Sequence, residues 1–118
     1  MGERERILLA DDSPLTRYVI KETIEVWGQE SGHEIVGEAA SEEEVACLLE
    51  DGLRPTVAII DARMPNKGDG ERVAALIRKK SPQTKIVSFS TNLQTWGDEN
   101  WEKGEVNAKD LVRKIGEL

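Results

Sequence analysis

The amino-acid sequence predicts an α/β protein built on a doubly wound parallel sheet. Two observations carry this prediction: short apolar runs alternate with segments of helical periodicity, and three of the apolar runs end in acidic or hydroxyl residues. Strands that are covered on both faces lack the apolar–polar alternation of a half-exposed sheet, so unbroken apolar runs are typical of parallel sheets. Right-handed crossovers through the intervening helices complete the expected architecture.

Four predicted strands follow one another along the chain. Residues 6–10 (RILLA), 57–60 (VAII) and 85–89 (KIVSF) are the strong candidates, and residues 34–38 (EIVGE) form a weaker one between the first two. Each run has the length of a strand and is too short for a helix. The secondary structure of the stretch that begins at residue 92 is poorly defined by the residue pattern.

The first two predicted helices have recognisable start signals. Ser13 offers a capping hydroxyl and Pro14 suits the first helical position, so a helix is expected from there to about Gly28. Residues 41–44 (SEEE) form a capping box, in which the serine and the last glutamate satisfy free backbone groups. That second helix is expected to end near Gly52.

Two more helices are predicted in the second half of the chain. Residues 71–80 place apolar side chains on one face and stop before Pro82, and Asn107 can cap a last helix. The apolar pattern of the first helix runs through Leu15, Tyr18, Val19, Ile24 and Val26. The last helix is expected to turn Leu111, Val112, Ile115 and Leu118 inward.

Four conspicuous side chains receive structural interpretations. Tyr18 and Trp27 are expected to be half-buried against the sheet, where aromatic rings on helices commonly pack. Cys47 lies in the apolar pattern of the second helix and is expected to be a small buried hydrophobe. His33 lies in a turn before the second strand and is expected on the surface.

Length and charge restrict the class of function. The 118 residues suit a single domain over residues 1–118. The chain has 16 Lys and Arg against 23 Asp and Glu, and this net charge of −7 argues against nucleic acid and anionic membranes as partners. A single cysteine cannot form an internal disulfide, which favours the cytoplasm. No apolar stretch approaches the roughly 20 residues of a membrane span, and the charged N-terminus is unlike a signal peptide.

Three of the apolar runs stop at side chains that carry oxygen. Asp11 and Asp12 follow the first run, Asp61 follows the third and Ser90 follows the fourth. These side chains are expected to converge, because the carboxyl ends of parallel strands share one edge of the sheet. Clustered carboxylates repel one another, and Mg²⁺ would resolve the conflict while leaving room for phosphate oxygens. With such an ion in place, an aspartate carboxylate can act as a nucleophile toward the phosphorus of an incoming phosphoryl group and form an acyl phosphate. Alternatively, Asp12 simply caps the first helix.

Together these residues resemble the receiver domain of bacterial two-component response regulators. The resemblance is carried by residues 7–14 (ILLADDSP), 35–39 (IVGEA), 59–65 (IIDARMP) and 69–70 (DG), and it covers residues 6 to about 91. It implies a flavodoxin-like sheet of the (βα)5 type. It also implies a regulatory phosphoprotein of phosphorelay signal transduction rather than an enzyme, with at most self-phosphorylation from phosphodonors and autodephosphorylation.

The resemblance assigns roles to individual residues. Asp61 would be the phosphoacceptor, and a sensor histidine kinase or a histidine phosphotransfer protein would supply the phosphoryl group. The resemblance implies that Mg²⁺ is bound directly by Asp12 and Asp61, largely through a water by Asp11, and by the backbone carbonyl of Arg63. Ser90 matches the switch hydroxyl that hydrogen-bonds the phosphoryl group and draws its loop inward.

The chain departs from the family pattern in three places. Residues 66–70 contain one residue more than usual, so the loop beyond Asp61 is expected to bulge. Thr91 replaces a smaller residue and would narrow the opening to Asp61. Residues 92–104 are about two helical turns too short, so only a shortened fourth helix is expected in this atypical segment.

The atypical segment also holds the best match to the family's phosphate-binding lysine. Lys103 takes that role by resemblance, with Trp101 standing in for the switch aromatic and Asn92 at a position that tunes the lifetime of the acyl phosphate. Gly104 replaces the usual proline, so a solvent-exposed Lys103 is the alternative interpretation. Lys109 is the fallback for the same role.

Three functions therefore remain open, and a phosphoacceptor switch that alters a partner-binding surface leads. A degenerate receiver that binds its partner without phosphorylation is favoured by the short segment 92–104. A Mg²⁺-dependent aspartyl-phosphate phosphatase would need an Asp-x-Asp motif after the first strand, whereas Asp11 and Asp12 are adjacent.

Overall fold

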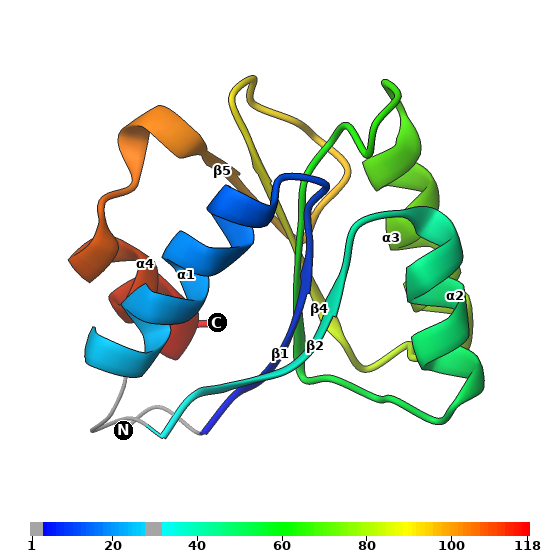
Figure 1. Cartoon of the computed structure of the whole chain (residues 1–118), viewed down its shortest axis with the longest axis horizontal. Helices are drawn as coiled ribbons and strands as arrows, with labels where there is room; N and C mark the ends of the chain where they lie inside the picture. Colours follow the sequence, from blue (N-terminus) through cyan, green and yellow to red (C-terminus); the bar gives the residue numbers. More distant parts are fainter. Residues whose placement is uncertain (1–3, 28–31) are drawn as a thin grey trace.

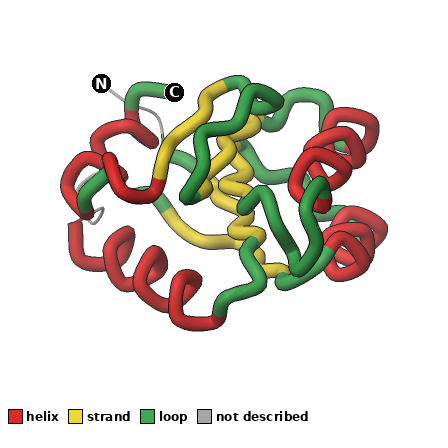
Figure 2. Tube along the Cα trace, turned by 90° about the horizontal axis from the view of Figure 1, so that it is seen from above, coloured by secondary structure: helices red, strands yellow, loops and turns green. Residues whose placement is uncertain are grey.

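The chain folds around a five-stranded parallel sheet, as seen in a computed structural model that describes residues 4–27 and 32–118. The strand order is β2-β1-β3-β4-β5. Helices α1 and α4 cover one face and α2 and α3 cover the other (Figure 1), and Figure 2 shows the same three layers from above. The elements are β1 (Arg6–Ala10), α1 (Pro14–Trp27), β2 (Glu34–Ala39), α2 (Glu42–Glu50), β3 (Val57–Ile60), α3 (Asp69–Lys80), β4 (Lys85–Ser90), β5 (Glu99–Glu102) and α4 (Ala108–Gly116), with a short 3-10 helix at Lys103–Glu105. The predicted doubly wound α/β architecture is confirmed.

The strand register brings the carboxyl ends of β1, β3 and β4 to one rim. Ala10, the last residue of β1, lies opposite Ala39 of β2 on one side and Ile60 of β3 on the other. Ile60 in turn lies opposite Ser88 of β4. Because all the strand pairs are parallel, the segments that follow β1 and β3 leave the sheet side by side.

The core is divided by the sheet into two apolar layers. Strand residues alternate between the two faces, so each central strand contributes side chains to both layers. The layer under α2 and α3 contains Leu8, Ala10, Val45, Leu49, Ala58, Ile60, Met64, Val73, Ile77 and Ile86. The layer under α1 and α4 contains Ile7, Leu9, Ile20, Ile24, Val57, Ile59, Val87, Phe89, Trp101, Leu111 and Ile115.

The predicted capping residues begin their helices as expected. The Ser13 hydroxyl accepts a hydrogen bond from the Thr16 N–H at 3.2 Å, and the Ser41 hydroxyl accepts one from the Glu44 N–H at 3.2 Å. Asn107 caps α4 in the same manner. Since Ser13 fills the capping position of α1, Asp12 is left free for another role.

Most of the apolar residues of α1 face outward. Only Ile20 and Ile24, one helical turn apart, are buried against the sheet. Tyr18 is exposed rather than half-buried, and the ring of Trp27 lies under the Lys109 ammonium of α4 at 5.1 Å instead of against the sheet. The other apolar residues on the outer surface of α1 are Leu15, Val19 and Val26.

Two smaller expectations are also corrected. Cys47 is exposed, because α2 turns Val45 and Leu49 inward and leaves position 47 on the outer side. His33 is buried, because β2 begins directly after it and pairs with β1. Its Nδ1 accepts a hydrogen bond from the Glu5 N–H at 3.0 Å, and burial lowers the pKa of the imidazole.

The connection between β4 and β5 contains no helix. Residues 91–98 run directly from the end of β4 to β5, which pairs in parallel with β4 (the yellow-to-orange loop in Figure 1). The expected shortened fourth helix is therefore absent, because eight residues must both reverse the chain and return it to the start of the next parallel strand. None of the described helices has the length and apolar character that would let it cross a membrane.

Candidate functional site

Three acidic side chains converge at the rim of the sheet. Asp11 and Asp12 follow β1 and Asp61 follows β3, and one carboxylate oxygen from each lies within 4.8 Å of the others. Asp11 is the most deeply placed, with 2% of its surface exposed, whereas Asp61 is partly buried and Asp12 is exposed. The strand topology thus brings together residues that are 50 positions apart in sequence.

Asp11 is held in place through both carboxylate oxygens. Its Oδ1 accepts a hydrogen bond from the Ser13 N–H at 2.9 Å, and its Oδ2 accepts one from the Lys103 ammonium at 3.0 Å. Arg17 donates to the Asp11 backbone carbonyl at 2.6 Å and also forms an ion pair with Glu38 of β2 at 3.3 Å. These contacts fix the end of β1 against its neighbours before any ligand binds.

Lys103 reaches the acidic cluster even though the preceding connection is short. Its Nζ lies 3.0 Å from Asp11 Oδ2 and 3.7 Å from Asp61 Oδ1, and it also lies over the Phe89 ring at 5.9 Å. Lys103 directly follows β5, and because β5 runs parallel to β4 its carboxyl end lies at the same rim. Lys109, the fallback, lies over Trp27 instead.

The electrostatics of Asp61 reflect the crowding of negative charge. Burial raises the pKa of the Asp61 carboxyl, and the nearby Asp11 and Asp12 raise it further, while Lys103 and the backbone of Arg63 oppose the shift. Three carboxylates against one ammonium leave two uncompensated negative charges at the rim. A hard divalent cation that prefers oxygen ligands fits this set of donors.

A cavity of about 620 Å³ opens above the cluster and contains the remaining predicted residues. Ser90 lies at the end of β4, and together with Asp61, Lys103 and Asn92 it lines this cavity, as Arg63 also does. Thr91 forms part of the same wall.

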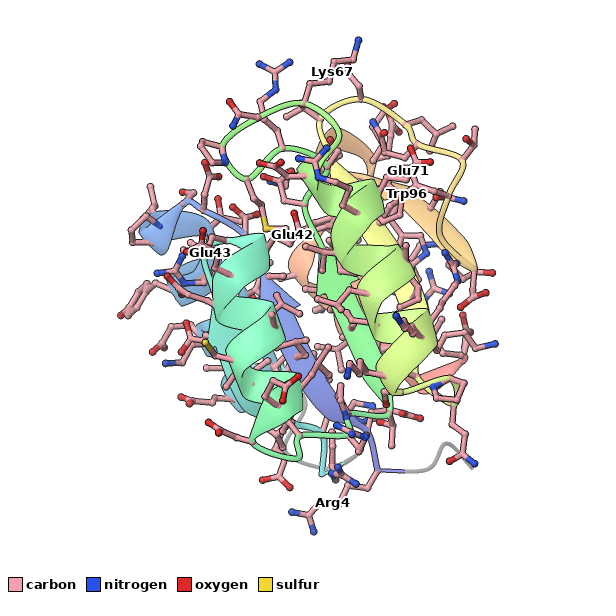
Figure 3. All side chains as sticks on the ribbon, turned by 90° about the vertical axis from the view of Figure 1, so that its right-hand side faces the viewer. Arg4, Glu42, Glu43, Lys67, Glu71 and Trp96 are labelled. Carbon is pink, nitrogen blue, oxygen red and sulfur yellow. The ribbon has the colours of Figure 1, made fainter. Side chains whose placement is uncertain are left out.

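The outer wall of the cavity is formed by the loop after Asp61, by the first turn of α3 and by the connection between β4 and β5. Lys67, Glu71 and Trp96 lie around the N-terminal end of α3 (Figure 3) and line the cavity from that side. Arg63 and Lys67 form an isolated antiparallel bridge, which closes the longer loop after Asp61.

Gly70 has a physical role that the sequence did not reveal. A Cβ atom on this residue would lie 2.2 Å from the backbone oxygen of Asp61 and 2.7 Å from the Cα of Ala62. The first turn of α3 therefore packs directly on the backbone that carries Asp61. Asp69 reinforces the contact, since its Oδ2 accepts a hydrogen bond from the Asn66 N–H at 2.8 Å. The Asp-Gly pair was visible in the sequence, but the contact that requires it was not.

Trp101 is not beside the acidic cluster. It lies opposite Phe89 in the apolar layer under α1 and α4, on the face of the sheet away from Ser88. Asn100 occupies the other face and hydrogen-bonds to the Ser88 hydroxyl at 2.7 Å. Because neighbouring strand residues point to opposite faces, Asn100 rather than Trp101 lies beside Ser88.

Comparison with known proteins agrees with this geometry. A family model described as the response regulator receiver domain matches residues 7–115. The chain is 36% identical over 81 residues to the positive alginate biosynthesis regulatory protein of Pseudomonas aeruginosa, which covers 69% of this chain and 31% of that protein. It is also 36% identical over 87 residues to the transcriptional regulatory protein PdtaR of Mycobacterium tuberculosis, which covers 72% of this chain and 40% of that protein.

These curated relatives are longer proteins, of which the chain spans about a third to two fifths. A solved structure of similar length is the signal receiver domain of the response regulator NarL from Mycobacterium tuberculosis. It superposes with a TM-score of 0.71 at 26% identity and covers 96% of this chain and 94% of that chain. The family match, the relatives and the shared fold agree, and this chain belongs to the response regulator receiver domain family.

Proposed function

We propose that this receiver domain accepts a phosphoryl group on Asp61. The observation that carries the proposal is the convergence of Asp11, Asp12 and Asp61 with Lys103, whose ammonium lies 3.0 Å from Asp11 and 3.7 Å from Asp61. A nucleophilic carboxylate, oxygen ligands for a cation and a fixed positive charge are the parts that phosphoryl transfer needs.

The same residues would hold a Mg²⁺ ion. Asp12 and Asp61 would be direct ligands, Asp11 would act through a water and Arg63 would offer its backbone carbonyl. Two negative charges remain uncompensated among the clustered side chains, which supports a divalent rather than a monovalent cation. When bound, Mg²⁺ would neutralise the charge that the carboxylates share with the phosphoryl oxygens.

In the transfer, one carboxylate oxygen of Asp61 attacks the phosphorus of a phosphohistidine on the partner. The oxygen–phosphorus bond forms as the phosphorus–nitrogen bond breaks, and the departing imidazole nitrogen keeps the electron pair and takes up a proton. Lys103 stabilises the negative charge on the phosphoryl oxygens. The product is a mixed anhydride on Asp61.

Residues at the end of β4 would then contact the phosphoryl group on Asp61 or control access to it. Ser90 lines the cavity and would hydrogen-bond the phosphoryl group through its hydroxyl. Thr91 limits access to Asp61, and the side chains of Arg63 and Asn92 line the route by which water would hydrolyse the anhydride.

The partner would be a sensor histidine kinase or a histidine phosphotransfer protein, and the transfer would take place in the cytoplasm. The domain would accept the group once and hold it, rather than turn over a substrate. A phosphatase is disfavoured, because the position two residues after Asp11 is Ser13, which caps α1. A degenerate receiver is also disfavoured, because Lys103 retains its contacts with the cluster.

Intact-mass spectrometry after incubation with Mg²⁺ and acetyl phosphate, and separately with a phosphorylated kinase, tests the proposal. We expect a single labile phosphate that is absent from Asp61→Asn and present in Asp51→Asn, whose side chain lies at the exposed end of α2. No adduct with either donor would leave the phosphorylation-independent scaffold as the better account. Continuous release of phosphate from phosphomonoesters would instead point to the hydrolase.

A further inference from the structure

The connection between β4 and β5 is divided into two halves that are held differently. We call residues 91–95 the arm, and residues 96–98 together with Glu99 and Asn100 at the start of β5 the clamp. Within the part of the chain that the structure describes, the hydrogen bonds of the arm are local, from Gln94 Nε2 to the Asn92 carbonyl at 2.7 Å and from Trp96 Nε1 to Gln94 Oε1 at 3.1 Å. The clamp is instead tied to β4 and α3.

Asn100 is the centre of the clamp. Its Oδ1 accepts hydrogen bonds from the Gly97 N–H at 2.9 Å and from the Ser88 hydroxyl at 2.7 Å, and its Nδ2 donates to the Gly97 carbonyl at 3.2 Å. The amide side chain of Asn100 thus connects the backbone of Gly97 to Ser88 of β4.

Two further residues attach the clamp to the body of the domain. The Asp98 N–H donates to the Ile86 carbonyl at 2.8 Å, and the Ile86 N–H donates to Asp98 Oδ2 at 2.8 Å. Arg78 of α3 donates to the Trp96 carbonyl at 2.8 Å. The Trp96 ring packs on the apolar layer under α3 and lies near Glu71 (Figure 3).

Gly97 shows how closely the clamp lies on the sheet. A Cβ atom there would be 2.5 Å from the Glu99 carbonyl oxygen and 3.0 Å from the Ser88 backbone nitrogen. The backbone therefore has no room to shift toward β4, and the hydrogen bonds of Asn100 and Asp98 oppose movement away from it.

The arm has the opposite character. It follows directly after Ser90, lines the cavity over Asp61 and exposes 62% of the Leu93 side chain. Residues 86–97 contain no charged side chain in a protein that is 33% charged. The surface of the arm is consequently built from hydroxyl groups, amide groups and one exposed leucine.

From this contrast we infer that phosphorylation rearranges the arm, and that the clamp keeps this change from passing along the backbone into the rest of β5, whose far end contacts the site separately through Lys103. The inference rests on the proposed phosphorylation of Asp61. A phosphoryl group in the cavity attracts the Ser90 hydroxyl, and the adjoining arm can follow because it has only local contacts. Movement beyond Trp96 would have to break the bonds of Asn100, Asp98 and Arg78 together. The surface that changes is therefore the uncharged arm with Leu93.

Amide hydrogen exchange measured by NMR tests the clamp without any phosphodonor. We expect the Gly97 and Asp98 amides to exchange at least about tenfold more slowly than the amides of the arm. Asn100→Ala should remove this protection at Gly97, and Thr95→Ala, an exposed position in the arm, should leave it in place. Equal exchange rates in the arm and the clamp of the wild type would overturn the inference.

The second measurement compares amide chemical shifts before and after phosphorylation, with the adduct on Asp61 verified by intact mass. In the wild type, we expect shift changes in residues 90–95 and at Lys103, which contacts Asp61, and none in residues 97–100. In Asn100→Ala, the changes should extend into β5. Equal changes in residues 97–100 of the phosphorylated wild type would refute the confinement and leave the proposed function standing. Absence of the adduct would refute both.

Discussion

The acidic rim and the β4–β5 edge of this domain are built by different means. At the rim, Asp11, Asp12 and Asp61 converge because parallel strands place their carboxyl ends together, so the sheet topology itself makes the site. At the edge, the connection has no helix, and side-chain hydrogen bonds from Asn100 and Asp98 hold it on the sheet. The comparison teaches that sheet topology alone can bring an acidic cluster together, while a few polar side-chain contacts determine the structure of the neighbouring surface.

Replacing Lys103 has the largest expected effect, because this residue joins the two regions. Lys103→Met removes the ammonium that lies 3.0 Å from Asp11 and 3.7 Å from Asp61. We expect phosphorylation of Asp61 to slow by about 10²- to 10³-fold, the usual cost of losing one group that stabilises developing charge. The initial rate of adduct formation by intact mass measures this.

Lys109→Met is the matched control, since Lys109 lies over Trp27 and away from the rim. Its rate should equal that of the wild type. Equal rates of Asp61 phosphorylation in Lys103→Met and in the wild type would mean that Lys103, at the end of β5, takes no part in the reaction.

Two glycines allow the packing of both regions to be compared directly. Gly70→Ala would place a Cβ atom 2.2 Å from the Asp61 backbone oxygen, and Gly97→Ala would place one 2.5 Å from the Glu99 backbone oxygen. Overpacking of this kind costs about 1–3 kcal/mol. Urea denaturation should show both losses of stability, with the larger one at Gly70, where two further backbone atoms lie within 3.0 Å.

Gly104→Ala serves as the control for both, because a Cβ atom there meets nothing within 4 Å. Its free energy of unfolding should stay within about 0.5 kcal/mol of the wild type, as for most surface substitutions. A stable Gly97→Ala variant would show that the clamp backbone does not lie tightly on β4.

The rim could be predicted from the sequence because its geometry follows from a repeated pattern. Unbroken apolar runs that end at Asp11, Asp61 and Ser90 define parallel strands, and parallel strands fix where their ends meet. The caps at Ser13 and Asn107 were equally predictable, since a capping side chain acts on backbone groups within three residues of itself.

The edge could not be predicted in the same way, because its contacts are specific and distant in sequence. The position of one short strand decides whether Asn100 or Trp101 faces Ser88, and a shift by one residue exchanges them. The burial of His33 depends likewise on pairing with the backbone of Glu5. The outer face of α1 shows what helical periodicity cannot predict. The helix carries more apolar residues than its contact with the sheet can bury, and the pattern does not tell which of them are exposed.

Addition of Mg²⁺ should stabilise the rim and leave the edge unaffected. At a free Mg²⁺ concentration ten times the dissociation constant, the gain is about 1.4 kcal/mol. For a domain of this size, that corresponds to a rise in Tm of about 5 °C. Thermal unfolding with Mg²⁺ and with EDTA measures the gain, which should be lost in Asp12→Asn and retained in Asn100→Ala. A gain that disappears in Asn100→Ala would contradict the independence of the two regions.

The smallest expected effect concerns the charge of Asp61 itself in the absence of a cation. Burial and the neighbouring Asp11 raise the pKa of Asp61 in the folded domain above its value in the unfolded chain. The folded state therefore binds the proton more tightly, and this contribution to stability is fully present below about pH 3.9, the ordinary pKa of an aspartate. It is lost as the pH rises through the raised pKa, so that at pH 7 the ionised carboxylate destabilises the fold.

Asp61→Asn should consequently be more stable than the wild type at pH 7 in EDTA, and the difference should shrink as the pH falls toward 4. Urea denaturation at several pH values measures the difference, and Asp51→Asn controls for loss of an exposed carboxylate at the end of α2. Saturating Mg²⁺ should reverse the order at pH 7, because only the wild type then gains a ligand for the ion. If Asp61→Asn were the less stable protein at pH 7 in EDTA, the carboxylates at the rim would not be in electrostatic conflict, and the main physical reason for a cation between them would be gone.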